Sequence, residues 1–554
     1  MKASAMKMKS LLPIFFCSVI SISAFSQHSQ LTVSEDFKVV EKEYQDETIA
    51  HSVYHNNCFF TATNSGIGGN YKWAFTKLYD LKYAVTISKY DKNMNKVKDF
   101  VLENGEKAFG PLLPQLLLLN NKLCLVFFQS DNKSSFNLYV APIDETTAIM
   151  GEKKKICTIQ QENVGIFKVE SVINAGIVYF CNAADNSKTL IACNASPGNI
   201  LTFVIDNNLN ILKQTVIHTS TEGFDISSAV LTNDNLECMV LASDKETKIV
   251  CNSADGKKSE MKFNPSGNLV PYNTRANLSN DGKSIYIYST SIMVDREDNS
   301  CNGLLVSQVD CSTLKLSKAQ AYEFSPEFLE TVYNKGAGFK HKREFFIHNF
   351  IPRLVELDNG SVAIIGCPQF ISSSSSQSAP NMNNQTHTVA TTTAETGSIF
   401  AFFPNKNGKT FEYALVPRNL TFSLSQSSGS GPIKIVSSPN FSTSYAGYTA
   451  AKSRDGIVIV YNDGQKNMAK AENDKIAETT TPKDIVLAEA LINKNKKLEY
   501  RKLIDNSTSS RYTYYLGNTI PTSGSSIIFP IGKQGMGFNA RKTYYTNWCF
   551  VDLK

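Results

Sequence analysis

The chain has 554 residues, of which 42% are hydrophobic and 19% are charged, with a formal net charge of +6 and 18 Pro. A chain of this length and apolar content can bury a large core, which excludes collagen, an intrinsically disordered tail and a disulfide-stapled miniprotein. The aromatic residues are 33 Phe and 23 Tyr against two Trp, a usage that favours β-sheets over helical bundles.

Residues 1–26 have the pattern of a cleaved secretory signal peptide. Three Lys lie within the first nine residues, residues 11–25 are apolar, and Ala24 and Ser26 are the small residues that precede a cleavage site. Later apolar runs are shorter than the roughly 18 residues that a membrane-spanning helix needs. We therefore expect residues 27–554 to be exported as a single domain, to the periplasm, the cell surface or the medium.

The charge of the exported chain speaks against a nucleic-acid partner. Removing the signal peptide takes away three Lys and no acidic residue, which leaves a net charge of +3. A nucleic-acid-binding protein would carry a concentrated basic stripe, and the sequence contains none of that size. We expect no nucleic acid among the partners.

One strand pattern recurs about eight times along the exported chain. Each unit has an apolar strand, a tight turn, a second apolar strand, a variable loop, a third strand that ends in Asp or Asn, a polar turn and a fourth strand. Most first turns contain Asn, Asp or Gly, which tolerate the positive φ of a two-residue hairpin turn. The first turns are Asn56-Asn57, Asn120-Asn121, Ala175-Gly176, Asp234-Asn235, Asp281-Gly282, Asn359-Gly360, Asp455-Gly456 and Ser523-Gly524. The third strands close at Asp91, Asp144, Asp206, Asp255, Asp310, Asn405, Asn493 and Asp552.

This repetition predicts an all-β fold, a β-propeller of about eight four-stranded blades, with seven blades as the alternative. The eighth unit supplies only three strands before the sequence ends, and an unassigned strand at residues 37–44 precedes the first unit. We expect residues 37–44 to complete the last blade and close the ring. The alternative is an extra edge strand on a seven-bladed or open assembly. A pair of β-sandwiches would not repeat one strand order so evenly.

Four long insertions, at residues 64–81, 289–302, 370–397 and 463–483, lie between the second and third strands of their units. Such loops emerge on the same face of a blade as the connections between blades, so one face should be elaborated. The insertion at 370–397 consists mainly of Ser, Thr, Asn and Gln, and we predict a mobile loop because these residues cannot offset the entropy of ordering. Residues 463–483 are similarly polar and are compatible with a brief helix.

A helix is predicted between the fifth and sixth units. Ser325 and Pro326 are typical of a helix start, and Gly336 marks the end. A basic run follows on the same elaborated face and could dock an acidic protein or glycan partner; the alternative is a solvated loop. The run consists of Lys340, His341, Lys342 and Arg343.

Local motifs of catalysis or metal binding are absent from the sequence. There is no His-Glu-x-x-His pair, no Gly-x-Ser-x-Gly elbow, and no Gly-Lys-Ser/Thr ending to the glycine-rich run 532–537. His51 and His55 share a face of a predicted strand but lie about 13 Å apart, too far to share a metal. We therefore predict no metal and no cofactor and name no catalytic residue.

The chain resembles secreted β-propeller proteins in general outline, without the signature residues of any one propeller family. The short charged start and the Phe25-Ser26-Gln27 ending of the signal peptide are similar to those of Bacteroidota. We expect a non-catalytic extracytoplasmic binding or scaffold protein, with a protein or glycan partner on the loop-rich face. The alternative is a hydrolase or lyase that acts on glycans or peptides in the central pocket, which converging carboxylates near the axis would favour.

Eleven Cys remain after cleavage, most of them in apolar runs where Cys serves as a small buried hydrophobe. In the hairpin of the fourth unit, Cys238 and Cys251 should lie opposite each other at a distance that a disulfide can bridge, in a compartment that permits one. We predict this disulfide. The alternative is that both thiols stay reduced, because a register shift of one residue would turn them to opposite faces.

Two further pairs of cysteines are close in the sequence. Cys181 and Cys193 offer a similar cross-strand pair, unless residues 200–206 form the third strand and leave Cys193 in a loop. Cys301 and Cys311 flank one strand, about 30 Å apart when it is extended, and should not pair with each other.

Overall fold

The computed structural model is all-β, with nine antiparallel sheets that are mostly four-stranded and one short α-helix among the residues it describes. The described residues are 30–33, 49–67, 82–103, 109–119, 122–130, 135–160, 178–196, 198–219, 223–243, 246–263, 269–293, 301–335, 352–377, 388–405, 408, 410–428, 447–468, 470, 476–480, 484–504, 512–514, 520–521, 526–533 and 545–553.

Sheets one to four each contain four consecutive strands. Sheet one has β2 (Ile49–His55), β3 (Cys58–Ile67), β4 (Lys82–Tyr90) and β5 (Lys96–Glu103). Sheet two has β6 (Phe109–Leu119), β7 (Lys122–Ser130), β8 (Ser135–Pro142) and β9 (Lys154–Gln160). Sheet three has β10 (Val178–Asn182), β11 (Lys188–Ser196), β12 (Asn199–Asp206) and β13 (Ile211–His218). Sheet four has β14 (Asp225–Leu231), β15 (Glu237–Ala242), β16 (Thr247–Asn252) and β17 (Lys258–Lys262).

Sheets five to eight follow the same order with additions. Sheet five has β18 (Leu269–Leu278), β19 (Ser284–Met293), β20 (Gly303–Asp310) and β21 (Gln320–Glu323). Sheet six has β22 (Arg353–Glu356), β23 (Val362–Gly366), β26 (Ile399–Pro404) and β27 (Phe411–Val416). Sheet seven has β29 (Tyr448–Ser453), β30 (Gly456–Gly464), β31 (Ile485–Asn493) and β32 (Leu498–Leu503). Sheet eight has β33 (Tyr512–Tyr514), β34 (Ile520–Pro521), β35 (Ser526–Lys533), β36 (Tyr545–Asp552) and β1 (Gln30–Val33). The ninth sheet has β24 (Gln369–Gln377), β25 (Thr388–Thr396) and β28 (Leu420–Ser428).

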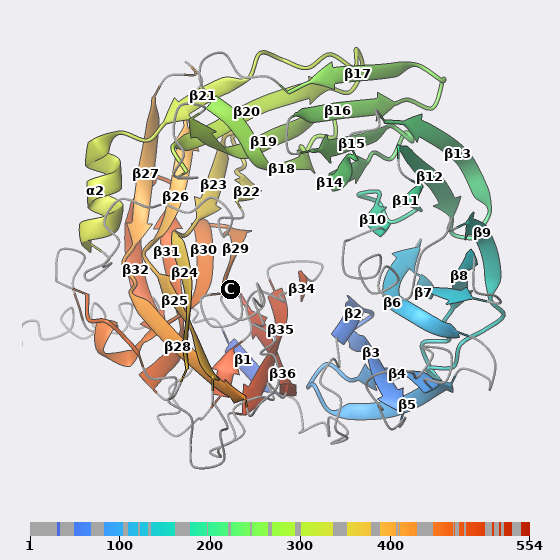
Figure 1. The fold of residues 1–554 in the computed structure, drawn as a ribbon, viewed down its shortest axis with the longest axis horizontal. Coiled ribbons are helices and arrows are strands. Elements are labelled where there is room, and N and C mark those ends of the chain that lie inside the picture. Colours follow the sequence, from blue (N-terminus) through green and yellow to red (C-terminus); the bar gives the residue numbers. More distant parts are fainter. Residues whose placement is uncertain are drawn as a thin grey trace, which may run out of the picture.

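Sheets one to eight follow one another around a common centre, and in sheets one to seven the first strand lies nearest that centre (Figure 1). A cluster of buried hydrophobic side chains lies between each sheet and the next. Successive residues of a strand point to opposite faces, so Phe203 of β12 packs against sheet two and Val204 packs against sheet four. This two-sided burial explains why the strands read as nearly continuous apolar runs.

Sheet eight contacts sheet one, which brings the two ends of the described chain together. Phe59 and Tyr90 of sheet one share a buried cluster with Ile528 of sheet eight, and the rings of Tyr54 and Phe550 lie 5.7 Å apart. This interface resembles the seven others in being apolar and in joining neighbouring sheets.

An N-terminal strand completes sheet eight, but it is not the one expected. Residues 30–33 pair antiparallel with β36, with Leu31 opposite Val551 and Val33 opposite Cys549. The expected strand at 37–44 lies outside the described residues. Leu31 and Val33, the two apolar residues of the observed strand, lie opposite apolar residues of β36. Such matching of alternating apolar positions fixes the register of a strand.

Most of the predicted first turns that fall in described residues have the expected geometry. Asn56 and Asn57 both have positive φ, 48° and 57°, and so do Asn235, Gly282 and Gly360 in the corresponding turns. The predicted turns at 120–121 and 523–524 lie outside the described residues.

Two predicted first turns were misplaced. In sheet seven, β30 begins at Gly456, so the turn is Arg454-Asp455. In sheet three, the predicted first turn at Ala175-Gly176 lies outside the described residues. Because β10 is the first strand of that sheet, its turn is at 183–187.

The acidic residues that close the third strands stabilise turns. The Asp310 carboxylate accepts hydrogen bonds from the Ser312 and Thr313 N–H groups at 3.0 and 2.8 Å, and Asp144 does the same with the residues that follow it. Hydrogen bonds from the Ser312 hydroxyl and the Thr313 N–H lower the pKa of Asp310 to about 2. The repeated Asp is therefore a structural element of the hairpin between the third and fourth strands.

The predicted helix is confirmed as α2 (Pro326–Lys335). The Ser325 hydroxyl accepts a hydrogen bond from the Phe328 N–H at 3.1 Å, which caps the helix start. The Phe328 ring is buried against Phe400 and Phe411, with ring centroids 5.5 and 5.4 Å away, so the helix packs on sheet six at the outer rim (Figure 1).

Candidate binding site

The ninth sheet is a continuation of sheet six beyond a bend. β23 leads through Cys367 and Pro368 into β24, β25 leads through Gly397 and Ser398 into β26, and β27 leads through residues 417–419 into β28. The strand order β23-β26-β27 on one side of the bend is repeated as β24-β25-β28 on the other. We call β24, β25 and β28 the arm.

The sequence predicted a mobile loop at residues 370–397, but the described part of this segment forms strands β24 and β25. β24 and β25 pair over nine consecutive residues, and β25 pairs with β28 over nine. The strands start from a sheet that already fixes their ends, so little loop-closure entropy opposes pairing. Thr and Val in β25 also favour strands, a signal that the low apolar content of the segment hid.

A buried arginine holds the bend. The Arg418 side chain is 0% exposed. Its Nε donates to the Gly397 carbonyl at 3.3 Å and one Nη donates to the Cys367 thiol at 2.8 Å, which fastens the three strands of the bend to one another. The other Nη donates to the carbonyls of Gly447 and Asn462 at 3.5 Å, so the same guanidinium also ties the bend to sheet seven.

A buried carboxyl lies beside this bend, at the end of β30. The Asp463 Oδ1 atom accepts hydrogen bonds from the Gly464 N–H at 2.7 Å and the Asn467 amide at 2.9 Å, whereas Oδ2 has no hydrogen-bond partner. Burial raises the pKa of Asp463 to about 6, although these hydrogen bonds and the Arg418 charge oppose the rise. A carboxyl in this position is costly to ionise.

The insertion of sheet seven folds back onto the base of the arm. The short 3-10 helix η3 (Gln465–Asn467) begins it, in keeping with the brief helix considered from the sequence. The Asn467 side-chain amide exchanges two hydrogen bonds with the backbone of Ala477, at 3.0 and 2.8 Å. Thr479 then pairs in parallel with Leu420, the first residue of β28. Sheet seven therefore braces the arm at its root.

The two faces of the arm differ in the residues that the register places on them. One face has Ser372, Thr393 and Ser423 side by side on the three strands, and two residues further along it has Ser374, Thr391 and Ser425. The opposite face has the apolar positions Ile371, Ala394 and Phe422 near the bend. Residues directly opposite on neighbouring strands share a face, so the first face is a block of hydroxyl-bearing positions.

The outer edge of β24 is the feature of the arm best suited to recognition. Among the described residues, β24 pairs on one side only, with β25. Its sequence, QFISSSSSQ, contains no charged residue and no Pro. Natural sheet edges are usually short or carry charges or Pro, because unpaired N–H and C=O groups invite another strand. This edge has neither kind of protection.

The basic run predicted as a docking patch, Lys340 to Arg343, lies outside the described residues, between α2 and β22. Two histidines have polar neighbours: the His55 Nε2 atom lies 3.5 Å from a Glu145 carboxylate oxygen, and the His218 Nδ1 atom lies 2.8 Å from the Asn199 amide oxygen. In the described part of the chain, no group of three or more His, Cys, Asp or Glu could hold a metal ion.

Two arginines lie on the strands nearest the centre. Arg275 of β18 donates to the Ser227 carbonyl at 2.7 Å, and Arg353 of β22 donates to the Thr449 hydroxyl at 3.3 Å. Both contacts join the first strands of neighbouring sheets. Their hydrogen-bond acceptors are a backbone carbonyl and a side-chain hydroxyl.

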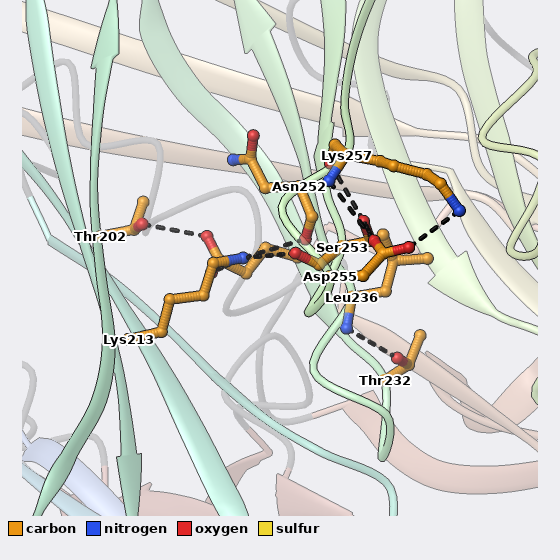
Figure 2. A network of polar contacts seen from close by, with 9 residues as sticks. Thr202, Lys213, Thr232, Leu236, Asn252, Ser253, Asp255 and Lys257 are labelled. Carbon is orange, nitrogen blue, oxygen red and sulfur yellow. Dashed lines mark hydrogen bonds and ion pairs between the residues drawn. The ribbon is translucent and has the colours of Figure 1, made fainter.

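A buried ion pair between sheets three and four also has a structural role. Glu237 is 0% exposed, its Oε1 lies 2.9 Å from the Lys213 Nζ, and its Oε2 accepts a hydrogen bond from the Thr202 hydroxyl at 3.0 Å (Figure 2). Lys213 also donates to the carbonyls of Asn252 and Ser253. The buried Glu237 carboxylate therefore has a cationic partner and a hydroxyl donor within the protein, whereas Lys213 is partly exposed.

The predicted register of the fourth unit is confirmed: Cys238 and Cys251 are direct cross-strand partners. Both are free thiols in the structure, so the bond between them stays a prediction. Cys181 and Cys193 are not partners, because Cys181 pairs with Leu190 and Cys193 pairs with Val178. Residues 199–206 do form the third strand, but Cys193 lies on the second strand, not in a loop.

Comparisons with known proteins do not place the chain in a family. No protein-family model matches it, and no curated protein matches it. A structure from a study of two prolyl endopeptidases aligns over 89% of this chain and 55% of its own, with 10% identity and a TM-score of 0.36. Prolyl oligopeptidase B from Galerina marginata aligns over 56% and 37%, with 10% identity and a TM-score of 0.29. A Synechocystis apocarotenoid oxygenase aligns over 50% and 61%, with 11% identity and a TM-score of 0.29.

The chain spans less than half the length of prolyl oligopeptidase B in this alignment. Within the described residues, no helix combines the length and the apolar character needed to cross a membrane.

Proposed function

We propose that this protein is an exported, non-catalytic binding module built on a closed eight-bladed β-propeller, and that the arm is its docking element. Sheets one to eight would be the blades. Support for closure comes from the eight apolar interfaces, the last of which joins sheet eight to sheet one, and from the pairing of β1 with β36. Export rests on the signal-peptide pattern of residues 1–26.

The observation that carries the binding proposal is the arm, whose free edge strand is held in a fixed position by a buried arginine. Binding loops work best when a rigid scaffold positions them, and here Arg418 and the sheet-seven insertion supply that rigidity. An edge strand without charges or Pro binds an extended peptide by adding it as a further strand, with main-chain hydrogen bonds providing affinity. The partner we propose is an extended, mainly uncharged segment of another protein.

A synthetic peptide tests this proposal. The peptide TVATTTAET, the sequence of β25, already pairs with β24 inside the protein and should add to the other edge of β24. We expect saturable binding by fluorescence anisotropy, with new hydrogen-exchange protection confined to β24. The control peptide carries Pro at its central Thr, which removes a backbone donor and blocks pairing.

Two variants of the full chain separate the arm from other surfaces. Replacing residues 369–396 with Asn-Gly and residues 420–428 with a Gly-Ser segment of equal length removes all three strands of the arm, including the β28 edge that pairs with β25. Peptide binding should then disappear while the melting transition persists. The triple variant Lys340→Ser, Lys342→Ser, Arg343→Ser should bind the peptide as wild type does. Binding that survives loss of the arm, or that depends on the basic run, would refute the arm as the docking element.

A further inference from the structure

Three cysteines from two sheets meet at one interface. Cys238 of β15 and Cys251 of β16 are Cα partners and are both 0% exposed. Cys311 follows directly after β20 of sheet five, is partly exposed, and packs against the same apolar cluster that contains the other two. The three thiols therefore form a chain that runs from the surface into the core between sheets four and five.

The side chains are close enough to interact. A hydrogen bond with the Cys251 thiol and burial raise the pKa of Cys238, to which Cys311 adds a smaller electrostatic contribution. Burial and the Cys251 thiol raise the pKa of Cys311. The Cys311 N–H donates to the Lys283 carbonyl at 3.0 Å, which fixes the turn that presents it. Direct cross-strand partners have Cα atoms about 4.5–5.5 Å apart, a separation that a disulfide spans without backbone movement.

We propose that these cysteines form a thiol–disulfide relay in which Cys311 is the entry thiol and the end product is a Cys238–Cys251 disulfide. Buried thiols are inaccessible to an oxidising disulfide, so oxidation needs a partly exposed neighbour. Cys311 is such a neighbour. The assignment adds an entry route to the disulfide that the sequence predicts, and it is independent of the binding function of the arm.

The relay balances as a series of exchanges with an external disulfide. The Cys311 thiolate attacks one sulfur of the external disulfide, which forms a mixed disulfide and releases one thiol. The Cys251 thiolate attacks the Cys311 sulfur and releases the second thiol. The Cys238 thiolate then attacks the Cys251 sulfur and returns Cys311 to a thiolate. Overall, Cys238 and Cys251 lose two protons and two electrons, and the external disulfide gains them.

Burial raises the pKa of Cys311 to about 11, so its reactive thiolate is a minor species near neutral pH. We therefore expect exchange on a slow timescale, and the experiment must follow it over hours. Cys181 and Cys193 provide an internal control. They pack in clusters on opposite faces of sheet three, so no exchange can join them.

The test treats the exported full chain with oxidised glutathione, quenches with an alkylating reagent under denaturing conditions, and maps peptides without reduction. Trypsin cleaves at Lys245 and Lys248 and separates Cys238 from Cys251, and cleavage before Asp310 by endoproteinase Asp-N separates Cys301 from Cys311. We expect a linked Cys238–Cys251 peptide, with Cys181 and Cys193 alkylated separately. In Cys311→Ser, the rate at which the linked peptide forms should fall by about tenfold or more.

Two results would overturn the relay. One is recovery of Cys238 and Cys251 as separate alkylated thiols while Cys311 is fully glutathionylated. The other is formation of the Cys238–Cys251 link at the wild-type rate in Cys311→Ser. If Cys311→Ser fails to fold, Cys311→Ala replaces it, and mapping of the wild-type chain tests the end product without any variant.

Discussion

Two buried ionisable side chains, Arg418 and Asp463, lie where the arm joins sheet six. Arg418 meets neutral carbonyls and a thiol, whereas one oxygen of Asp463 has no hydrogen-bond partner. Each group is costly to bury in its charged form. The two groups have different structural roles. Arg418 links the strands of the bend. Asp463 positions Asn467, whose amide bonds to the backbone of the sheet-seven insertion.

The carboxyl of Asp463 should make stability depend on pH in a specific window. Its pKa is about 6 in the folded chain against an ordinary value of 3.8, so between these values the folded state binds more protons than the unfolded state. The contribution of this carboxyl to the free energy of unfolding is fully present below pH 4 and is lost as the pH rises through 6. The total loss is about 3 kcal/mol. Asp463→Asn should remove that loss, measured as the difference in free energy of unfolding from urea titrations at pH 4 to 7.

Asp144→Asn is the matched control for this experiment. Hydrogen bonds from Thr147 lower the pKa of Asp144, so its titration lies below the window. Its wild-type and variant stabilities should therefore run parallel between pH 4 and 7. An equal slope in wild type and Asp463→Asn would show that Asp463 is already ionised at pH 4 in the folded chain.

At the scale of elements, the arm is a part of sheet six that has been redirected. Its strands keep the pairing order of the sheet, and the direction changes within two or three residues at each of three crossings. Such a bend exposes backbone groups that a continuous sheet would pair. Arg418 donates to one of them, the Gly397 carbonyl, and also to the Gly447 carbonyl of sheet seven. The orientation of the whole arm then depends on one side chain.

Replacing Arg418 should destabilise the arm more than it destabilises sheets one to eight. Arg418→Met fills the space but leaves the carbonyls of Gly397 and Gly447 without this donor, at a cost of about 3 kcal/mol. Hydrogen exchange should speed up in residues 369–396 and 420–428. Arg275→Met, which removes an arginine that donates to a carbonyl between sheets four and five, should leave exchange in the arm unchanged. Equal acceleration in both variants would refute the role of Arg418 as the pin of the bend.

At the scale of the whole molecule, sheets one to eight bury apolar side chains on both faces against their neighbours. The buried clusters run from sheet to sheet, and the cluster of Phe59, Tyr90 and Ile528 covers the faces of the first and last sheets in the series. The strand β1 adds the outer edge of sheet eight, so the N-terminal segment contributes to the last element of the chain. Loss of either contact would leave apolar surface or a strand edge open.

Deleting residues 27–33 from the chain that begins at Gln27 should therefore lower the melting temperature by about 2–5 °C, because β36 loses its partner β1. A truncation that removes residues 27–29 alone leaves β1 intact and should melt as the full chain does. Calorimetry on both truncations makes the comparison. If they melt together, β1 adds nothing to the stability of sheet eight.

The sequence by itself determined the β-class, the repeating four-strand unit, helix α2, most of the described hairpin turns and the register of Cys238 with Cys251. These features depend on neighbours in the chain: alternation of apolar residues, Asn or Gly where φ is positive, and a Ser cap. Only the tertiary structure decided that residues 30–33 pair with β36, that the polar residues 369–377 and 388–396 form strands, and that Arg418 is buried. Those outcomes depend on partners that are distant in the chain, and the local sequence does not identify a distant partner.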